Sequence, residues 1–124
     1  MIELSQEEAA ASALLVGLPG SDLSEIKGLV SSLGMSIARS FLLSRLEPAP
    51  AYGMGSGKAE EIAALAESLA ADVIIFDFEI DPRKQRNWEK LAKRPVFDRQ
   101  EVILRIFAQR ARTKEAVLQV RLAQ

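Results

Sequence analysis

Asp72-Val-Ile-Ile-Phe-Asp-Phe78 is the clearest strand in this sequence of 124 residues, and it decides the fold. The segment is apolar on both of its faces, which is typical of a central strand in a parallel sheet whose two faces are covered. We therefore expect a buried parallel strand here, with the rest of the sheet arranged around it.

Short apolar runs alternate with helical patterns around this strand. The predicted strands are Ala13–Val16, Met35–Leu46, Asp72–Phe78 and Arg94–Phe97. The predicted helices are Asp22–Leu33, Lys58–Ala71 and a third that begins at Asp81-Pro82, and residues 47–50 form an extended connector. Pro95 indicates that the last strand lies at an edge. These alternating strand–helix units predict an α/β fold with a four-stranded parallel sheet and right-handed crossovers.

A further helix is expected to begin after Asp98, which has the character of an N-cap, with Glu101 favouring the first turn. At about 100° per residue, the pattern predicts a broad buried arc made of Val102, Ile103, Leu104, Ile106 and Phe107. Arg105, Gln109 and Arg112 fall together on the opposite, solvent-facing side, while Arg110 points nearer the apolar arc. This polar stripe is a candidate contact surface. A core helix with a solvated back remains the alternative.

Charge is divided sharply along the chain. The segment 1–81 holds thirteen acidic and four basic residues, a net charge of −9, whereas the segment 82–124 holds four and twelve, a net charge of +8. Such a basic half tends to meet phosphate, anionic lipid or an acidic partner, unless the two halves neutralise each other within one fold. Aromatic residues are sparse in the basic half, so backbone or shape recognition fits better than base stacking.

Composition excludes much of enzyme chemistry. The chain has no cysteine and no histidine, which excludes disulfides, thiol nucleophiles and the usual zinc, triad and imidazole sites. Its length suits one domain with its own core. The apolar stretch Ala9–Leu18 is too short to span a bilayer, and the N-terminus is acidic. We expect a cytoplasmic protein that makes no membrane contact.

Two places are candidates for small-molecule chemistry, and the first is Gly53-Met-Gly55-Ser-Gly57-Lys58. Before a helix, this loop could present backbone amides and an ammonium group to a phosphate. It is not a Walker A motif, because Tyr52 stands where a glycine is needed and Ala59 where Ser or Thr is needed. It also lacks the third glycine of a dinucleotide fingerprint. A plain turn and a nucleotide-binding loop both stay open.

The second place is the carboxyl end of the central strand, where Asp77, Glu79 and Asp81 follow one another. Ligands of α/β sheets usually lie at this edge. A phosphoacceptor role for Asp77, as in receiver domains, lacks the acidic pair and the lysine that such domains carry. Asp81 is already explained as a helix cap, and a magnesium site has no neighbouring phosphate ligand to support it.

Five stretches together resemble the N-terminal domain of HflX-type GTPases in both order and spacing. They are Tyr52-Gly-Met-Gly-Ser-Gly-Lys-Ala-Glu-Glu-Ile62, Asp72-Val-Ile-Ile-Phe-Asp77, Gln85-Arg-Asn-Trp-Glu89, Val96-Phe-Asp-Arg99 and Ile106-Phe-Ala-Gln-Arg-Ala-Arg-Thr113. The resemblance is tight from Tyr52 to Gln124 and looser before Pro50, where only the order of the elements carries it.

The resemblance implies an α/β N-terminal domain at residues 1–112 and the truncated start of a long helical linker at residues 113–124. The GTPase domain, which holds GTP and Mg²⁺, is then absent from this chain. This chain alone is accordingly expected to be no enzyme, with no catalytic residue, no metal site and no cofactor.

The resemblance also implies partners, because members of this family bind the ribosome. We expect contacts with the RNA of the large subunit or with the chain's own GTPase domain. The matching contact positions are Arg99, Arg105, Gln109, Arg110, Arg112 and Lys114, and the loop positions, for contact or phosphate binding, are Gly53, Gly55, Gly57 and Lys58. The alternative function is a small nucleotide-binding sensor that uses this loop.

Overall fold

The computed structural model describes residues 11–45, 49 and 51–123, with side chains described as far as residue 112. Strands and helices alternate through this part of the chain. The strands are β1 (Ser12–Gly17), β2 (Ser36–Leu42), β3 (Val73–Phe76) and β4 (Val96–Asp98), and the helices are α2 (Ser24–Ser32), α3 (Ser56–Ser68), α4 (Pro82–Ala92) and α5 (Arg99–Ala123).

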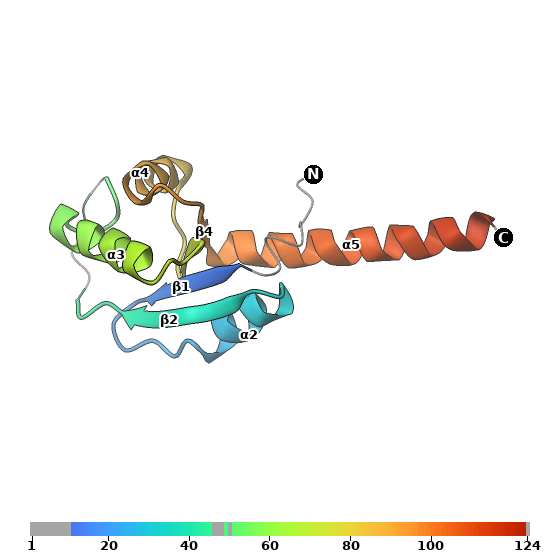
Figure 1. Ribbon diagram of the computed structural model, residues 1–124, viewed down its shortest axis with the longest axis horizontal. Coiled ribbons are helices and arrows are strands. Elements are labelled where there is room, and N and C mark those ends of the chain that lie inside the picture. The colour runs from blue at the N-terminus through green and yellow to red at the C-terminus, as the bar shows by residue number, and fades with distance from the viewer. Residues whose placement is uncertain (1–10, 46–48, 50, 124) are drawn as a thin grey trace.

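The four strands form one parallel sheet in the order β2-β1-β3-β4. This confirms the predicted α/β fold, and it places β4, with Pro95 before it, at an edge. The strand order reverses between β1 and β3, which are neighbours although a strand and two helices separate them in the sequence. Figure 1 shows the sheet between its helices, with α5 extending away from the body as one long helix.

The sheet has an apolar core on each face, which explains why the segment Asp72–Phe78 is apolar throughout. Ile74 and Phe76 of β3 face a cluster that includes Ile62 of α3 and Trp88 of α4. The alternate β3 residues, Val73 and Ile75, face a second cluster that holds buried residues of α2 and α5. Because successive side chains of a strand point to opposite faces, four apolar residues in a row serve both cores.

The predicted start of α3 and the predicted end of β2 were wrong. Helix α3 begins at Ser56, two residues earlier than expected, because Gly55 has an extended backbone and acts as its N-cap. Strand β2 ends at Leu42 rather than Leu46, since its partner β1 ends opposite it at Gly17. The predicted connector 47–50 lies almost wholly outside the described residues.

Side-chain caps account for the starts of α4 and α5. The Asp81 side chain accepts a hydrogen bond from the backbone N–H of Lys84 at 2.8 Å, and Asp98 does the same for Glu101 at 2.8 Å. These two predicted caps are confirmed. Helix α2 begins at Ser24, two residues later than its predicted start, and its N-cap position is Leu23, which has no side-chain cap, although the Asp22 carboxylate accepts the backbone N–H of Ser24 at 3.0 Å.

Helix α5 follows β4 without an intervening loop, and it covers the sheet only with its first turns. Val102 and Ile106 are buried there, whereas Leu104 and Phe107 are 56% and 60% exposed. The predicted buried arc is therefore confirmed for Val102 and Ile106 and wrong for Leu104 and Phe107, because a helix that leaves the body meets it along a narrow strip. The predicted domain boundary between residues 112 and 113 falls inside α5 and remains a prediction.

Candidate functional site

The glycine-rich loop before α3 is fastened to α4. The indole Nε1 of Trp88 donates a hydrogen bond to the carbonyl oxygen of Tyr52 at 2.9 Å, and the Asn87 amide donates to the carbonyl oxygen of Ala51 at 2.9 Å. The Tyr52 and Trp88 rings also meet edge to face, with centroids 5.4 Å apart. Sequence reasoning missed this anchor, although a buried Trp needs an acceptor for its N–H.

The residues predicted to bind phosphate are divided between the loop and the helix. Gly53 takes a positive φ of 78° in the turn and Gly55 is the N-cap, whereas Gly57 and Lys58 already belong to α3. The ammonium group of Lys58 contacts the carboxylate of Glu61 at 2.9 Å and lies 5.6 Å from the centre of the Phe41 ring. Its charge is thus paired within the chain at a partly exposed position, and the role of the loop as a phosphate site remains a prediction.

Arg99, at the start of α5, joins three elements at the carboxyl edge of the sheet. Its guanidinium contacts the Asp77 carboxylate at 3.2 Å and also pairs with Glu25 of α2. The Asp77 side chain is only 9% exposed, so this contact neutralises a largely buried charge. The Arg99 side chain is 36% exposed, and its predicted role as an external contact remains a prediction. The role of Glu25 was missed, since 74 residues separate it from Arg99.

The carboxylates that follow β3 have separate roles. Asp77 pairs with Arg99, Asp81 caps α4, and Glu79 is exposed beside a small pocket that Arg99, Gln100 and Ile103 also line. The backbone N–H of Lys84 lowers the pKa of Asp81, with smaller help from the charges of Lys84 and Arg83. Within the described residues, no group of three or more His, Cys, Asp or Glu is placed to hold a metal ion.

Arg105 was predicted to face solvent, and that prediction was wrong. Its side chain is 14% exposed, its Nε donates to Glu101 Oε1 at 3.1 Å, and its guanidinium lies 4.2 Å from the centre of the Phe97 ring. Gln109 and Arg112 are partly buried and each has a partner. Arg110 is exposed rather than turned toward the apolar arc. The side chain of Lys114 lies outside the described residues.

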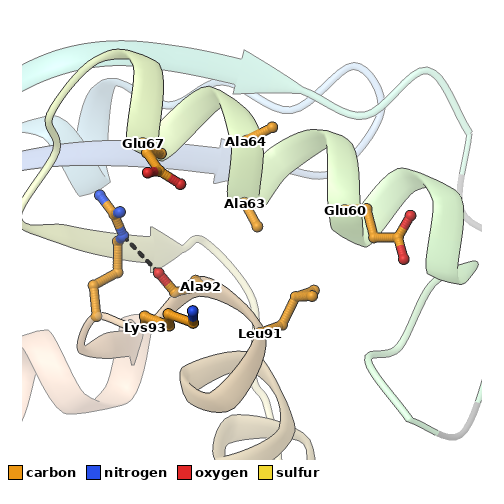
Figure 2. Close-up of a pocket in the computed structure, with 8 residues that line it drawn as sticks. Glu60, Ala63, Ala64, Glu67, Leu91, Ala92 and Lys93 are labelled. Carbon is orange, nitrogen blue, oxygen red and sulfur yellow. Dashed lines mark hydrogen bonds between the residues drawn. The ribbon is translucent and has the colours of Figure 1, made fainter.

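A groove of about 350 Å³ separates α3 from α4. Figure 2 shows Glu60 and Glu67 along α3, with Leu91 and Lys93 across from them at the end of α4. Arg94 closes one end of the groove, where its guanidinium donates to the carbonyl oxygens of Ala66 at 3.1 Å, of Ala92 at 2.9 Å and of Ala71. These bonds satisfy carbonyl groups at the ends of both helices, which gives Arg94 a structural role.

No helix among the described residues is long and apolar enough to cross a membrane.

Comparisons with known proteins show the family of this domain. Residues 20–108 match the model of the family described as GTP-binding GTPase N-terminal. The GTPase HflX of Escherichia coli K12 is 48% identical over 103 residues, which are 83% of this chain and 24% of that protein. The GTPase HflX of Akkermansia muciniphila is 48% identical over 101 residues, 82% of this chain and 23% of that protein.

A solved structure shares the fold. The complex of a protein called SsGBP with GDP matches with a TM-score of 0.64 and 23% identity, over 90% of this chain and 33% of that one. The chain spans about a quarter of the length of the two HflX relatives. The sequence resemblance is thereby confirmed, and the chain belongs to the GTP-binding GTPase N-terminal family, as an N-terminal domain of the HflX type.

Proposed function

We propose that this chain is a noncatalytic domain of a cytoplasmic HflX-type GTPase, which docks on the RNA of the large ribosomal subunit and contacts the GTPase domain of the same protein. One observation carries the proposal. The boundary between the acidic and basic halves of the sequence coincides with the start of α4 at Pro82, so the excess positive charge belongs to α4, β4 and α5.

This division gives the molecule two electrostatically different parts. The acidic half builds β1, α2, β2, α3 and β3, and the basic half builds the remaining helices, which lie at the outside of the body and beyond it. A surface with locally concentrated positive charge attracts RNA phosphates, while the acidic part limits indiscriminate adhesion to polyanions. The support is electrostatic, so we expect positioning contacts to the backbone rather than readout of bases.

Contact with the GTPase domain is supported by the outer face of α5. Leu104 and Phe107 are the two most exposed large apolar side chains among the described residues, and they lie within one helical turn. The HflX relatives have about three quarters of their length outside the matched region. A neighbouring domain of the same protein is therefore the occupant that we propose for this face, and we propose that GTP and Mg²⁺ bind in that domain.

Sedimentation with purified large ribosomal subunits tests the RNA contact. We expect the chain to pellet with large subunits at low salt and to be released as salt rises, with a log–log slope of about 0.7 to 0.9 per phosphate contact. Failure to pellet even at low salt would exclude RNA docking by this domain.

Nucleotide binding by the chain alone is tested separately. Because Lys58 is held by Glu61 and no Ser or Thr follows it, we expect neither tight GTP binding nor GTP turnover. Magnesium-dependent turnover that Lys58→Ala abolishes would contradict the noncatalytic role.

A further inference from the structure

Among the side chains that the structure describes, the charge distribution points to α4 as a phosphate-contacting surface of this domain. We propose that four exposed side chains along this helix and at its C-cap, which we call the α4 stripe, bind the phosphate backbone of structured RNA: Arg83, Arg86, Lys90 and Lys93. The inference rests on the proposed RNA docking and specifies the residues that perform it. None of the four was predicted as a contact from the sequence.

The stripe follows from helical geometry. Positions 83, 86, 90 and 93 are separated by three, four and three residues, which brings them to one side of a helix with about 3.6 residues per turn. All four residues are exposed, whereas Trp88 and Ala92, on the opposite side of α4, are buried in the core. Lys93 is the C-cap, in the left-handed conformation just after the last turn, and its side chain also lines the groove toward α3. At about 1.5 Å per residue, the stripe is roughly 15 Å long.

The carboxylates around α4 are occupied elsewhere. Glu89 accepts the backbone N–H of Val96 at 3.2 Å, and Asp81 caps the helix, with the Lys84 ammonium group 3.8 Å away. Asp81 interacts with Arg83 through the backbone N–H of Arg83 and through longer-range attraction to its charge, without an ion pair to its side chain. Glu60 and Glu67 stand across the groove from Lys93 in Figure 2. Yet no carboxylate of the described residues forms an ion pair with a stripe side chain.

Two cations of α5 provide the contrast. Arg99 is paired with two carboxylates, and Arg105 is covered and bound to Glu101, so both charges are satisfied within the fold. On the stripe, by comparison, like charges three and four residues apart repel one another along the helix. Four cations held together without internal partners present their field to solvent, where an anion can relieve the repulsion.

RNA is the anion that suits this geometry. A nucleic acid duplex carries one phosphate charge about every 1.7 Å of its axis, so a stripe of roughly 15 Å faces more phosphates than it has cations. Trp88 is buried, and the stripe therefore offers no aromatic surface for unstacked bases. Backbone contact with folded RNA follows, and it carries no sequence preference of its own.

The test compares two double variants of the chain with equal change in net charge. Arg86→Gln with Lys90→Gln removes the middle of the stripe, and Lys27→Gln with Arg39→Gln removes two exposed cations from α2 and β2. Affinity for purified large ribosomal subunits is measured at several salt concentrations. We expect the stripe variant to bind about tenfold more weakly near 0.1 M salt and to lower the slope by about 1.4 to 1.8, while the control matches the wild type.

The results separate this inference from the function on which it rests. If the wild-type chain binds and both double variants keep its affinity and slope, the stripe is not the contact and the inference fails while RNA docking stands. Equal weakening by both variants also overturns it, because net charge alone would then explain the effect. If the wild-type chain does not bind at low salt, the proposed docking fails. Urea unfolding of both double variants is the control that checks whether they remain folded.

Discussion

The guanidinium of Arg105 lies over the ring of Phe97, 4.2 Å from its centre. Phe97 belongs to β4 and Arg105 to the second turn of α5, so the contact covers the junction at which the strand becomes a helix. Glu101 holds the same guanidinium at 3.1 Å from the side of α5. Arg105 therefore belongs to the packing of the domain, and its removal is expected to affect stability before any binding.

We expect Arg105→Ala to lower the free energy of unfolding by about 1 to 2 kcal/mol, because it removes a covered cation–π contact, an ion pair and the packing of the side-chain stem. Arg110→Ala, at an exposed position of the same helix, is the control and should change it by less than about 0.5 kcal/mol. Urea denaturation measures both. Equal stabilities of the two variants would place Arg105 in solvent.

Arg99 should couple energetically with Asp77. Removing the guanidinium leaves a largely buried carboxylate unpaired, so Arg99→Ala is expected to cost about 1 to 3 kcal/mol of stability. A double-mutant cycle with Asp77→Ala should show a coupling free energy of about 1 kcal/mol or more. Glu25→Ala should cost less than about 1 kcal/mol, because its side chain is 67% exposed. If the changes in unfolding free energy of Arg99→Ala and Asp77→Ala were strictly additive, the Arg99–Asp77 ion pair would be ruled out.

Two glycines should respond oppositely to alanine. A Cβ on Gly17 would lie 2.7 to 2.9 Å from side-chain atoms of Leu23, Ser21 and Leu42, so Gly17→Ala is expected to destabilise the fold by about 1 to 3 kcal/mol. Gly28 lies inside α2 with open space around it, and Gly28→Ala should stabilise by about 0.5 to 1 kcal/mol. Thermal unfolding of both variants checks the opposite signs, and a shift in the same direction would refute the steric account.

The Asp81 cap of α4 should make the stability of the domain depend on pH. The backbone hydrogen bond from Lys84 lowers the pKa of Asp81, so the folded state holds this proton less tightly than the unfolded chain does. The stabilisation is therefore present above about pH 4 and is lost as the pH falls through the lowered folded-state pKa. Asp81→Asn keeps an acceptor without the charge, and its stability should approach that of the wild type in acid. A titration of the Asp81 carboxyl carbon by NMR at an ordinary midpoint would disprove the effect.

The exposed face of α5 formed by Leu104 and Phe107 is expected to make a functional contact only in the full-length protein. In a full-length HflX-type protein that carries this domain, Leu104→Ser with Phe107→Ser is expected to raise amide exchange in the contacted part of the GTPase domain and to alter GTP turnover. Leu42→Ser, at a 47% exposed position of β2, is the control and should do neither. Unchanged exchange in the double variant would show that the α5 face has another occupant.

Local signals in the sequence were sufficient for most of the fold. The apolar run of β3 and the caps Asp81 and Asp98 act within a few residues, so their patterns predict their structures directly. The wrong predictions concern tertiary contacts. A helical projection cannot show that α5 leaves the body, which exposes Leu104 and Phe107 and lets Phe97 cover Arg105. The Arg99–Glu25 pair joins residues too distant in sequence for any spacing rule.

The direct passage from β4 into α5 has a mechanical consequence. With 25 residues the helix is about 37 Å long, so a tilt of about 5° at its root moves its tip by roughly 3 Å. No loop absorbs that motion, because Asp98 is both the last residue of the strand and the cap of the helix. The domain is thus built as a lever whose pivot is the three-residue edge strand β4. A force applied at the far end of α5 is transmitted first to the sheet.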